Sequence, residues 1–246
     1  VAKLASWFSE YNSAGIKAYY YKFDVRRFFY RIDHGVLMND IIKKKISDKY
    51  TVELIRYYMC STQRPFGMPL YGDSRTITDD EMLWDKGIAI GGGLSHMIGN
   101  MYLDPLDQYA KRTLGIKHYI RFADDIIITD PDKEKLKEYG RLLTQFLNEK
   151  LLLEFNDRCA LRPNSCGCEF VGCMIYPDHV LLRKSTTLHM KRRLRSVAED
   201  YRDYRVTYDY CKQVAASYAG MLDHVDGDSF KEKLWEDFVL THNTED

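Results

Sequence analysis

The stretch that decides the fold is His118-Tyr119-Ile120-Arg121-Phe122-Ala123-Asp124-Asp125-Ile126-Ile127-Ile128-Thr129-Asp130. Two short runs of β-prone residues flank a pair of adjacent carboxylates, which predicts a hairpin with Asp124 and Asp125 at or beside its turn. Asp is a common turn residue, so the pair by itself is more typical of a turn than of catalysis. Two ionised carboxylates repel each other by about 4 kcal/mol at ~4 Å and an effective dielectric of ~20. The pair therefore favours a bound cation or a shared proton.

The composition describes a folded chain without net charge. Hydrophobic residues make up 45% and aromatic residues 13% of the 246 residues, which argues against disorder. No apolar run approaches the ~20 residues of a membrane helix and no signal peptide is apparent, so we expect a cytoplasmic protein without membrane contact. Lys+Arg and Asp+Glu both total 36, so a nucleic-acid surface requires segregated charge, as in the basic segment 182–195. The cysteines between 159 and 173 are expected to be reduced thiols, with a zinc site as the alternative.

Helices are expected where apolar residues recur at helical spacing. These segments are residues 4–11, 36–42, 52–58, 97–106, 136–146 and, with few breaks, 185–238. Asp33 is predicted to cap the second of them, and Asp130-Pro131 to start the fifth. Besides the hairpin, β-prone runs predict strands at residues 18–25, 151–155, 168–176 and 180–182. A loop-rich insertion without an assigned role is expected at about residues 61–90.

A glycine-rich turn precedes one of these helices. Its sequence is Gly91-Gly92-Gly93-Leu94-Ser95, and such a turn lets a ligand approach the backbone and the N–H groups at the start of a helix. The spacing matches neither the dinucleotide-binding nor the P-loop pattern. A tight turn without a ligand is the alternative interpretation.

A third carboxylate, Asp24, ends the strand expected at residues 18–25. Asp24, Asp124 and Asp125, with the backbone carbonyl of Val25, form a set of hard oxygen ligands that suits two Mg²⁺ ions, with Mn²⁺ as a substitute. Two such ions suit phosphoryl transfer at a phosphodiester. The combination points to a nucleotide polymerase.

Three segments resemble motifs A, B and C of reverse transcriptases, and they occur in that order. They are Lys22-Phe23-Asp24-Val25-Arg26-Arg27-Phe28-Phe29, Gly91-Gly92-Gly93-Leu94-Ser95 with Asn100 and Leu103, and Arg121-Phe122-Ala123-Asp124-Asp125. Residues 169–184 resemble the stretch that leads from palm to thumb in bacterial members. The similarity is closest to the retron, diversity-generating retroelement and group II intron branches, and it covers nearly the whole chain.

The resemblance implies an α+β fold, a right-hand polymerase palm followed by an all-helical thumb. The palm is an antiparallel sheet with helices packed on one face, expected over residues 1–184, with strands resembling a primer grip at 168–184. The thumb is expected over residues 185–246. The implied catalytic residues and metal ligands are Asp24, Asp124 and Asp125, with Val25 as a further ligand.

The resemblance also implies contacts with nucleotide and nucleic acid. Phe29 matches the bulky gate that excludes the nucleotide 2′-OH, which implies dNTP substrates. The other implied nucleotide-binding residues are Gly91, Gly92, Ser95 and Arg158. The implied nucleic-acid contacts are Phe122, Arg183, Lys184, Lys191, Arg192, Arg193 and Arg195. The implied partners are an RNA template and a DNA or RNA primer, with a cognate structured RNA or accessory protein as a further candidate.

The function implied by the resemblance is that of an RNA-directed DNA polymerase. A catalytically silent RNA-binding scaffold of the same fold is the alternative, and an RNA-templated RNA polymerase is a third interpretation, against which Phe29 argues. Motif A begins near the start of the chain and leaves no room before Asp24 for the fingers that normally precede it. Whether the chain is active by itself therefore stays open.

Overall fold

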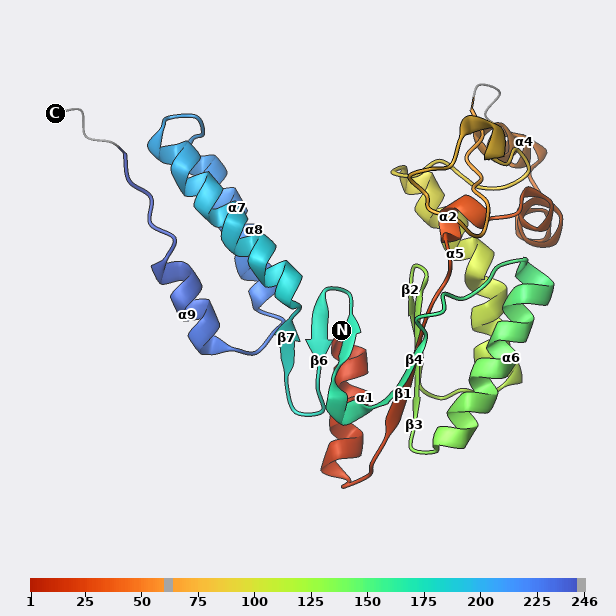
Figure 1. Cartoon of the computed structure of the whole chain (residues 1–246), viewed down its shortest axis with the longest axis horizontal. Coiled ribbons are helices and arrows are strands. Elements are labelled where there is room, and N and C mark those ends of the chain that lie inside the picture. The colour runs from red at the N-terminus through yellow and green to blue at the C-terminus, as the bar shows by residue number, and fades with distance from the viewer. Residues whose placement is uncertain (60–63, 243–246) are drawn as a thin grey trace. The chain divides into compact units, whose positions relative to one another are not determined.

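The computed structural model describes residues 1–59 and 64–242 (Figure 1). The chain divides into two compact units: Ala18–Arg162 forms one, and Val1–Lys17 together with Pro163–Asp246 forms the other. The first few residues of the expected insertion at 61–90 lie outside the described residues. No helix in the described part of the chain is long and apolar enough to cross a membrane.

A four-stranded sheet organises the unit Ala18–Arg162. Its strand order is β2-β3-β1-β4. The strands are β1 (Tyr19–Asp24), β2 (Tyr119–Phe122), β3 (Asp125–Asp130) and β4 (Ala160–Pro163). β3 pairs antiparallel with both β1 and β2, so the predicted hairpin is confirmed, and Ala123 and Asp124 form its turn.

One face of this sheet packs against helix α6 (Lys133–Leu151). Successive side chains of a strand point to opposite faces, so Tyr21 and Phe23 share a face with the buried Ile126 and Ile128 opposite them. Gly140 of α6 lies against Tyr21 and Phe23, where a side chain has no room. The expected arrangement of helices on one face of an antiparallel sheet is confirmed, and Asp24 and Asp125 lie on the other face.

The remaining helices of this unit follow the apolar periodicity of the sequence. They are α2 (Phe28–Arg31), the π-helix η1 (Val36–Ile42) continued by α3 (Lys43–Lys45), α4 (Lys49–Met59), the 3-10 turn η2 (Asp79–Glu81), and α5 (Gly93–Gln108) continued by the π-helix η3 (Tyr109–Thr113). The side chain of Asp33 accepts a hydrogen bond from the backbone N–H of Val36 at 3.0 Å, as predicted for a cap. The residues of the expected insertion that the structure describes are mostly irregular, as expected.

Two predictions about the segment around α6 were wrong, and one strand after it was not predicted. The helix starts at Lys133, two residues later than expected, because the side chain of Asp132, and not that of Asp130, accepts the backbone hydrogen bonds of its first turn. Residues 151–155 form no strand, since the apolar stripe of α6 extends to Leu151 and the chain then turns at Leu152, whose φ is 51°. The strand next to β1 is β4, which the sequence did not reveal.

The second unit combines α1 (Ala2–Ser13), a three-stranded sheet and three helices. The strands are β5 (Cys168–Phe170), β6 (Cys173–Ile175) and β7 (Val180–Leu182), in that order and antiparallel. The single strand expected at 168–176 is thus two strands, because Val171 and Gly172 both adopt positive φ and form a two-residue hairpin turn. The short 3-10 turn η4 (Asn164–Cys166) precedes them.

The helical part of the second unit begins at Lys184, next to the expected Ser185. Its helices are α7 (Lys184–Arg202), α8 (Tyr208–Leu222) and α9 (Asp228–Glu236). Asp226 joins the α8–α9 loop to β7: its carboxylate accepts a hydrogen bond from the N–H of Val180, and its own N–H donates to the carbonyl of Val180, both at 2.7 Å. The helices are therefore anchored to the three-stranded sheet of the same unit.

Candidate active site

Two of the three predicted carboxylates lie directly opposite each other. In the antiparallel pairing of β1 with β3, Asp24 is the partner of Asp125, so the two side chains share the sheet face that α6 does not cover. Asp124 precedes Asp125 and lies in the turn of the hairpin. Its carbonyl accepts a hydrogen bond from the N–H of the buried Val25 at 3.4 Å. The sheet register thus brings all four predicted metal ligands to one end of the β1–β3 pair.

The opposed carboxylates have polar partners within the protein. Lys22, two residues before Asp24 on the same face, lies with its Nζ 3.2 Å from a carboxylate oxygen of Asp125. Asn156 holds Asp24 twice: its side-chain amide donates to Oδ2 at 2.6 Å and its backbone N–H donates to the carbonyl at 2.7 Å. Asn156 could not be predicted as a partner of Asp24, because it lies 132 residues away in the chain. These contacts orient the two carboxylates and offset part of their repulsion.

The surroundings of Asp124 disfavour the charge of its carboxylate. Burial raises the pKa of Asp124 above its usual range, and the negative charges of Asp24 and Asp125 raise it further. A cation among these oxygen atoms would relieve that repulsion, so the donor set fits a hard divalent ion such as Mg²⁺. Among the described residues, however, no three His, Cys, Asp or Glu side chains come close enough together to hold a metal ion as they stand.

Arg121, for which no role was predicted, holds the turn that contains Asp124. Arg121 pairs with Asp107 of α5 through its Nε and Nη2 atoms, at 2.9 and 2.7 Å, and its Nη1 donates to the side chain of Asn100 at 3.0 Å. The same Nη1 donates to the carbonyl of Ala123 at 2.9 Å. Ala123 has a φ of 53°, which is unfavourable for a residue with a Cβ. Arg121 therefore joins the strained turn to α5.

Phe29 lies next to the start of α5. Its ring contacts the ring of His96 edge to face at 5.7 Å, and a side chain at Gly99 would meet it at 3.1 Å. The glycine turn is held by a hydrogen bond at 2.8 Å between the hydroxyls of Ser95 and Tyr58. Ser95 is 1% exposed and also donates to the carbonyl of Ala89, so its side chain is engaged inside the protein. The structure thus brings Phe29 and the glycine turn to the same helix end.

The glycine turn presents backbone toward solvent. Gly91 is exposed with a φ of 101°, a conformation that favours glycine, and a side chain at Gly92 would meet the Tyr58 hydroxyl at 2.8 Å. Arg158 is also exposed, and it lies two residues beyond Asn156, which holds Asp24. These residues are accessible to a ligand.

Two arginines that follow β1 bind the irregular segment after α4. Arg27 donates from Nη1 to the carbonyl of Pro69 at 2.6 Å and from Nη2 to that of Gly72, and Arg31 donates to that of Met68 at 3.2 Å. Arg27 stands in the segment that resembles motif A and Arg31 lies just after it, but in the structure both bind backbone carbonyls. This role could not be found from the sequence, since the carbonyl acceptors come from a segment without periodicity.

The predicted nucleic-acid contacts have different surroundings. Phe122, the partner of Asp125 in the hairpin, is 59% exposed. Arg183 pairs with Glu169 across the three-stranded sheet at 2.6 Å, while Lys184 and Arg192 are exposed. Of the predicted set, five side chains are exposed: Phe122, Arg183, Lys184, Arg192 and Arg195.

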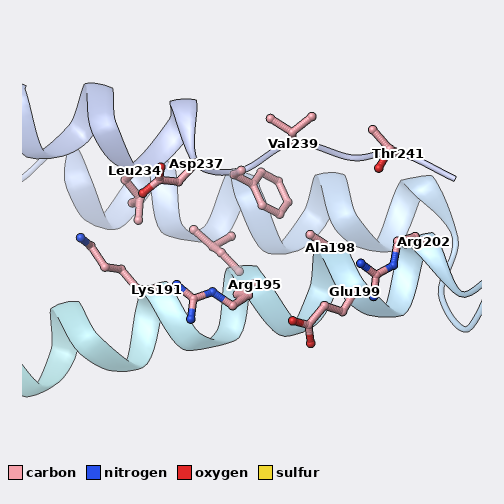
Figure 2. A pocket seen from close by; sticks show the side chains of 11 residues that line it. Lys191, Arg195, Ala198, Glu199, Arg202, Leu234, Asp237, Val239 and Thr241 are labelled. Atoms are coloured by element: carbon pink, nitrogen blue, oxygen red, sulfur yellow. The ribbon is translucent and has the colours of Figure 1, made fainter. Parts of the chain in front are cut away.

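The other basic residues of α7 face neighbouring helices. Arg193 donates to the hydroxyl of Tyr210 of α8 at 2.5 Å, and the Nζ of Lys191 lies 5.4 Å from the ring centre of Phe230 of α9. Figure 2 shows Lys191 and Arg195 on the side of α7 that lines a pocket of about 410 Å³ with α9 and the segment after it. A direct role in following nucleic-acid phosphates remains a prediction for these residues.

The chain is similar to known proteins both in sequence and in structure. A family model described as "Reverse transcriptase (RNA-dependent DNA polymerase)" matches residues 4–175. No curated protein matches the chain. Among solved structures, apo telomerase from Candida tropicalis has a TM-score of 0.53 at 11% identity, over 97% of this chain and 49% of that one. Telomerase from the same organism in complex with a TWJ fragment of telomeric RNA has a TM-score of 0.51 at 13% identity, over 82% and 37%.

The chain thus spans half or less of the length of these solved structures. At such low identity the similarity concerns the fold, which agrees with a palm followed by a helical thumb.

Proposed function

Because the chain belongs to the reverse transcriptase (RNA-dependent DNA polymerase) family, we propose that it extends a primer on an RNA template by nucleotidyl transfer from dNTPs. The observation that supports this most directly is the register that sets Asp24 against Asp125 and places Asp124 in the adjoining turn. Palm residues 1–184 and thumb residues 185–246 are part of the proposal, as is the assignment to the bacterial retroelement branches whose motifs the chain resembles. The cytoplasmic location stays a prediction.

In the proposed site, Asp24, Asp124, Asp125 and the carbonyl of Val25 would hold two Mg²⁺ ions, or Mn²⁺ in their place. Bound there, such ions supply charge neutralisation for the reacting phosphate and lower the pKa of the attacking hydroxyl. The protein holds the ligands in place: Asn156 orients Asp24, and the register of β1 and β3 keeps Asp24 opposite Asp125.

Other residues of the proposed site select and position the substrates. Phe29, fixed against His96 and Gly99, leaves no room for a 2′-OH and favours dNTPs. Arg158 is exposed and offers a positive charge to the triphosphate, and Gly91 lets the nucleotide approach the backbone. Phe122, exposed beside the aspartates, contacts the primer end. In the proposed reaction the template is RNA. One of the two telomerases with a similar fold was solved in complex with a fragment of telomeric RNA.

Primer extension tests the proposal. We expect Mg²⁺-dependent incorporation of dNTPs on an RNA template by the protein that contains this chain, and its loss in Asp124→Ala. Phe29→Ala should admit rNTPs, with the ratio of rNTP to dNTP incorporation rising by at least about tenfold, since the clash with the 2′-OH is removed. Absence of extension of any primer in either metal would exclude the polymerase.

A catalytically silent RNA-binding scaffold is the second candidate. The observation that favours it is that Lys22 and Asn156 already bind the carboxylates of Asp125 and Asp24, while no metal-binding cluster is present among the described residues. In an active enzyme these contacts must yield to cations. RNA binding that is unchanged in Asp124→Asn, together with no polymerisation, would select this candidate.

A further inference from the structure

Aromatic side chains gather where α7 ends and α8 begins. Tyr201 lies in the last turn of α7, Tyr204 in the connecting turn, and Tyr208 at the start of α8. Tyr204 is 69% and Tyr208 59% exposed, although tyrosine rings in a folded protein usually cover one another or the core. Together with Tyr210 they line an open groove of about 580 Å³.

One planar ring already occupies this groove. The imidazole of His242 stacks on Tyr204, with the ring centres 4.3 Å apart and an angle of 5° between the planes. It also contacts Tyr201, with 4.2 Å between the ring centres and an angle of 35°. Two tyrosines thus contact one flat heteroaromatic ring that comes from another segment. We call the space bounded by Tyr201 and Tyr204 the aromatic slot.

The charges beside the aromatic slot are paired with one another. Arg205 donates from Nε to Asp200 at 2.8 Å, and its Nη2 lies 3.1 Å from Asp203. Arg202 lies 3.5 Å from the same Asp203. Two arginines and two aspartates therefore balance, so the slot attracts neither a phosphate nor a cation strongly. The slot therefore suits a neutral flat ring, which it can bind by aromatic stacking.

We propose that the aromatic slot binds one unpaired nucleobase of single-stranded RNA, and that His242 occupies it when RNA is absent. Imidazole is the five-membered ring of a purine, so a purine base offers the tyrosines the same flat ring that His242 offers. Unpaired bases in RNA are commonly stacked on tyrosine and histidine side chains. The proposal relies on the proposed function only for the identity of the ligand as RNA, and its residues belong to the unit that does not contain the three aspartates.

The test is the affinity of the chain for a short single-stranded adenosine oligonucleotide, measured by fluorescence anisotropy without dNTPs. Tyr204→Ala should weaken binding about five- to tenfold, because one base stack is lost, and Tyr204→Phe should keep the affinity. His242→Ala should tighten binding, because the competing ring is removed. Tyr50→Ala is the matched control, since Tyr50 is 88% exposed on α4 and should have no effect.

An oligonucleotide of abasic residues separates stacking from contacts with the phosphates. With the abasic oligonucleotide, wild type and Tyr204→Ala should have the same affinity. The proposal is overturned if Tyr204→Ala and His242→Ala leave the affinity unchanged, if the Tyr204 effect persists with abasic RNA, or if neither wild type nor His242→Ala binds RNA. A Tyr204-dependent affinity in a protein without primer extension would support the slot and exclude the polymerase.

Discussion

Replacing Asp124 with asparagine should stabilise the metal-free protein while abolishing the proposed activity. Asp124 is half-buried beside two like charges, Asp24 and Asp125, and the pKa of its carboxyl is raised by burial and by those charges. Asparagine keeps the shape and is well tolerated in turns. The substitution therefore removes an unfavourable charge without removing a turn residue.

The magnitude follows from the surroundings of Asp124. A like charge at ~4 Å costs from about 1 kcal/mol in water to about 4 kcal/mol at an effective dielectric of ~20. Asp124 is partly open to solvent and Lys22 offsets some of the repulsion, so the low end of this range applies. We expect Asp124→Asn to raise the free energy of unfolding by about 1 kcal/mol, equivalent to about 3 °C in Tm for a chain of this size.

The effect should depend on pH and on metal. Because the folded state raises the pKa of Asp124, its ionisation lowers stability as pH rises from the ordinary pKa of an aspartate through the raised value. The stabilisation in Asp124→Asn should therefore be absent in strong acid and complete at neutral pH. Saturating Mg²⁺ should make wild type the more stable of the two proteins, since the cation binds the wild-type site more tightly.

Urea denaturation of both proteins in EDTA and in Mg²⁺, over a series of pH values, measures these quantities. Asp80→Asn is the control, because Asp80 is exposed and its replacement should change stability by less than about 0.5 kcal/mol. Two results would contradict the reasoning. One is an Asp124→Asn protein that is less stable than wild type in EDTA at neutral pH. The other is a difference in the free energy of unfolding between the two proteins that does not vary with pH.

Three further substitutions test other parts of the structure. Arg121→Ala should lower the free energy of unfolding by about 3–5 kcal/mol in urea denaturation, because the largely buried carboxylate of Asp107 loses its cationic partner and keeps the hydrogen bond from the Tyr119 hydroxyl; a change below about 1 kcal/mol would contradict this. Gly140→Ala should cost about 1–3 kcal/mol, since the new methyl group overlaps Tyr21, whereas the control Gly220→Ala, with open space around it in α8, should gain up to about 1 kcal/mol. Asp132→Ala should cost about 1 kcal/mol by removing the cap of α6, seen as a lower midpoint in thermal unfolding followed by circular dichroism.

Local patterns predicted the elements around the site well. The β-prone runs on either side of Asp124 and Asp125 form the hairpin, and the capping side chain of Asp33 lies where the spacing placed it. Both depend on residues within a few positions of one another. The prediction was wrong at residues 151–155, where a short apolar run was compatible with either a strand or the end of α6, and periodicity alone does not separate these.

The sequence by itself determined the family, through three ordered motifs, and the identity of the three acids. Only the tertiary structure decided what surrounds them. Lys22 meets Asp125 across 103 residues of sequence, and Asn156 meets Asp24 across 132. The register of β1 against β3 and the path of the chain after α6 create these contacts, and both depend on packing in the whole unit. No local pattern encodes them, because each residue taken alone is an ordinary polar side chain.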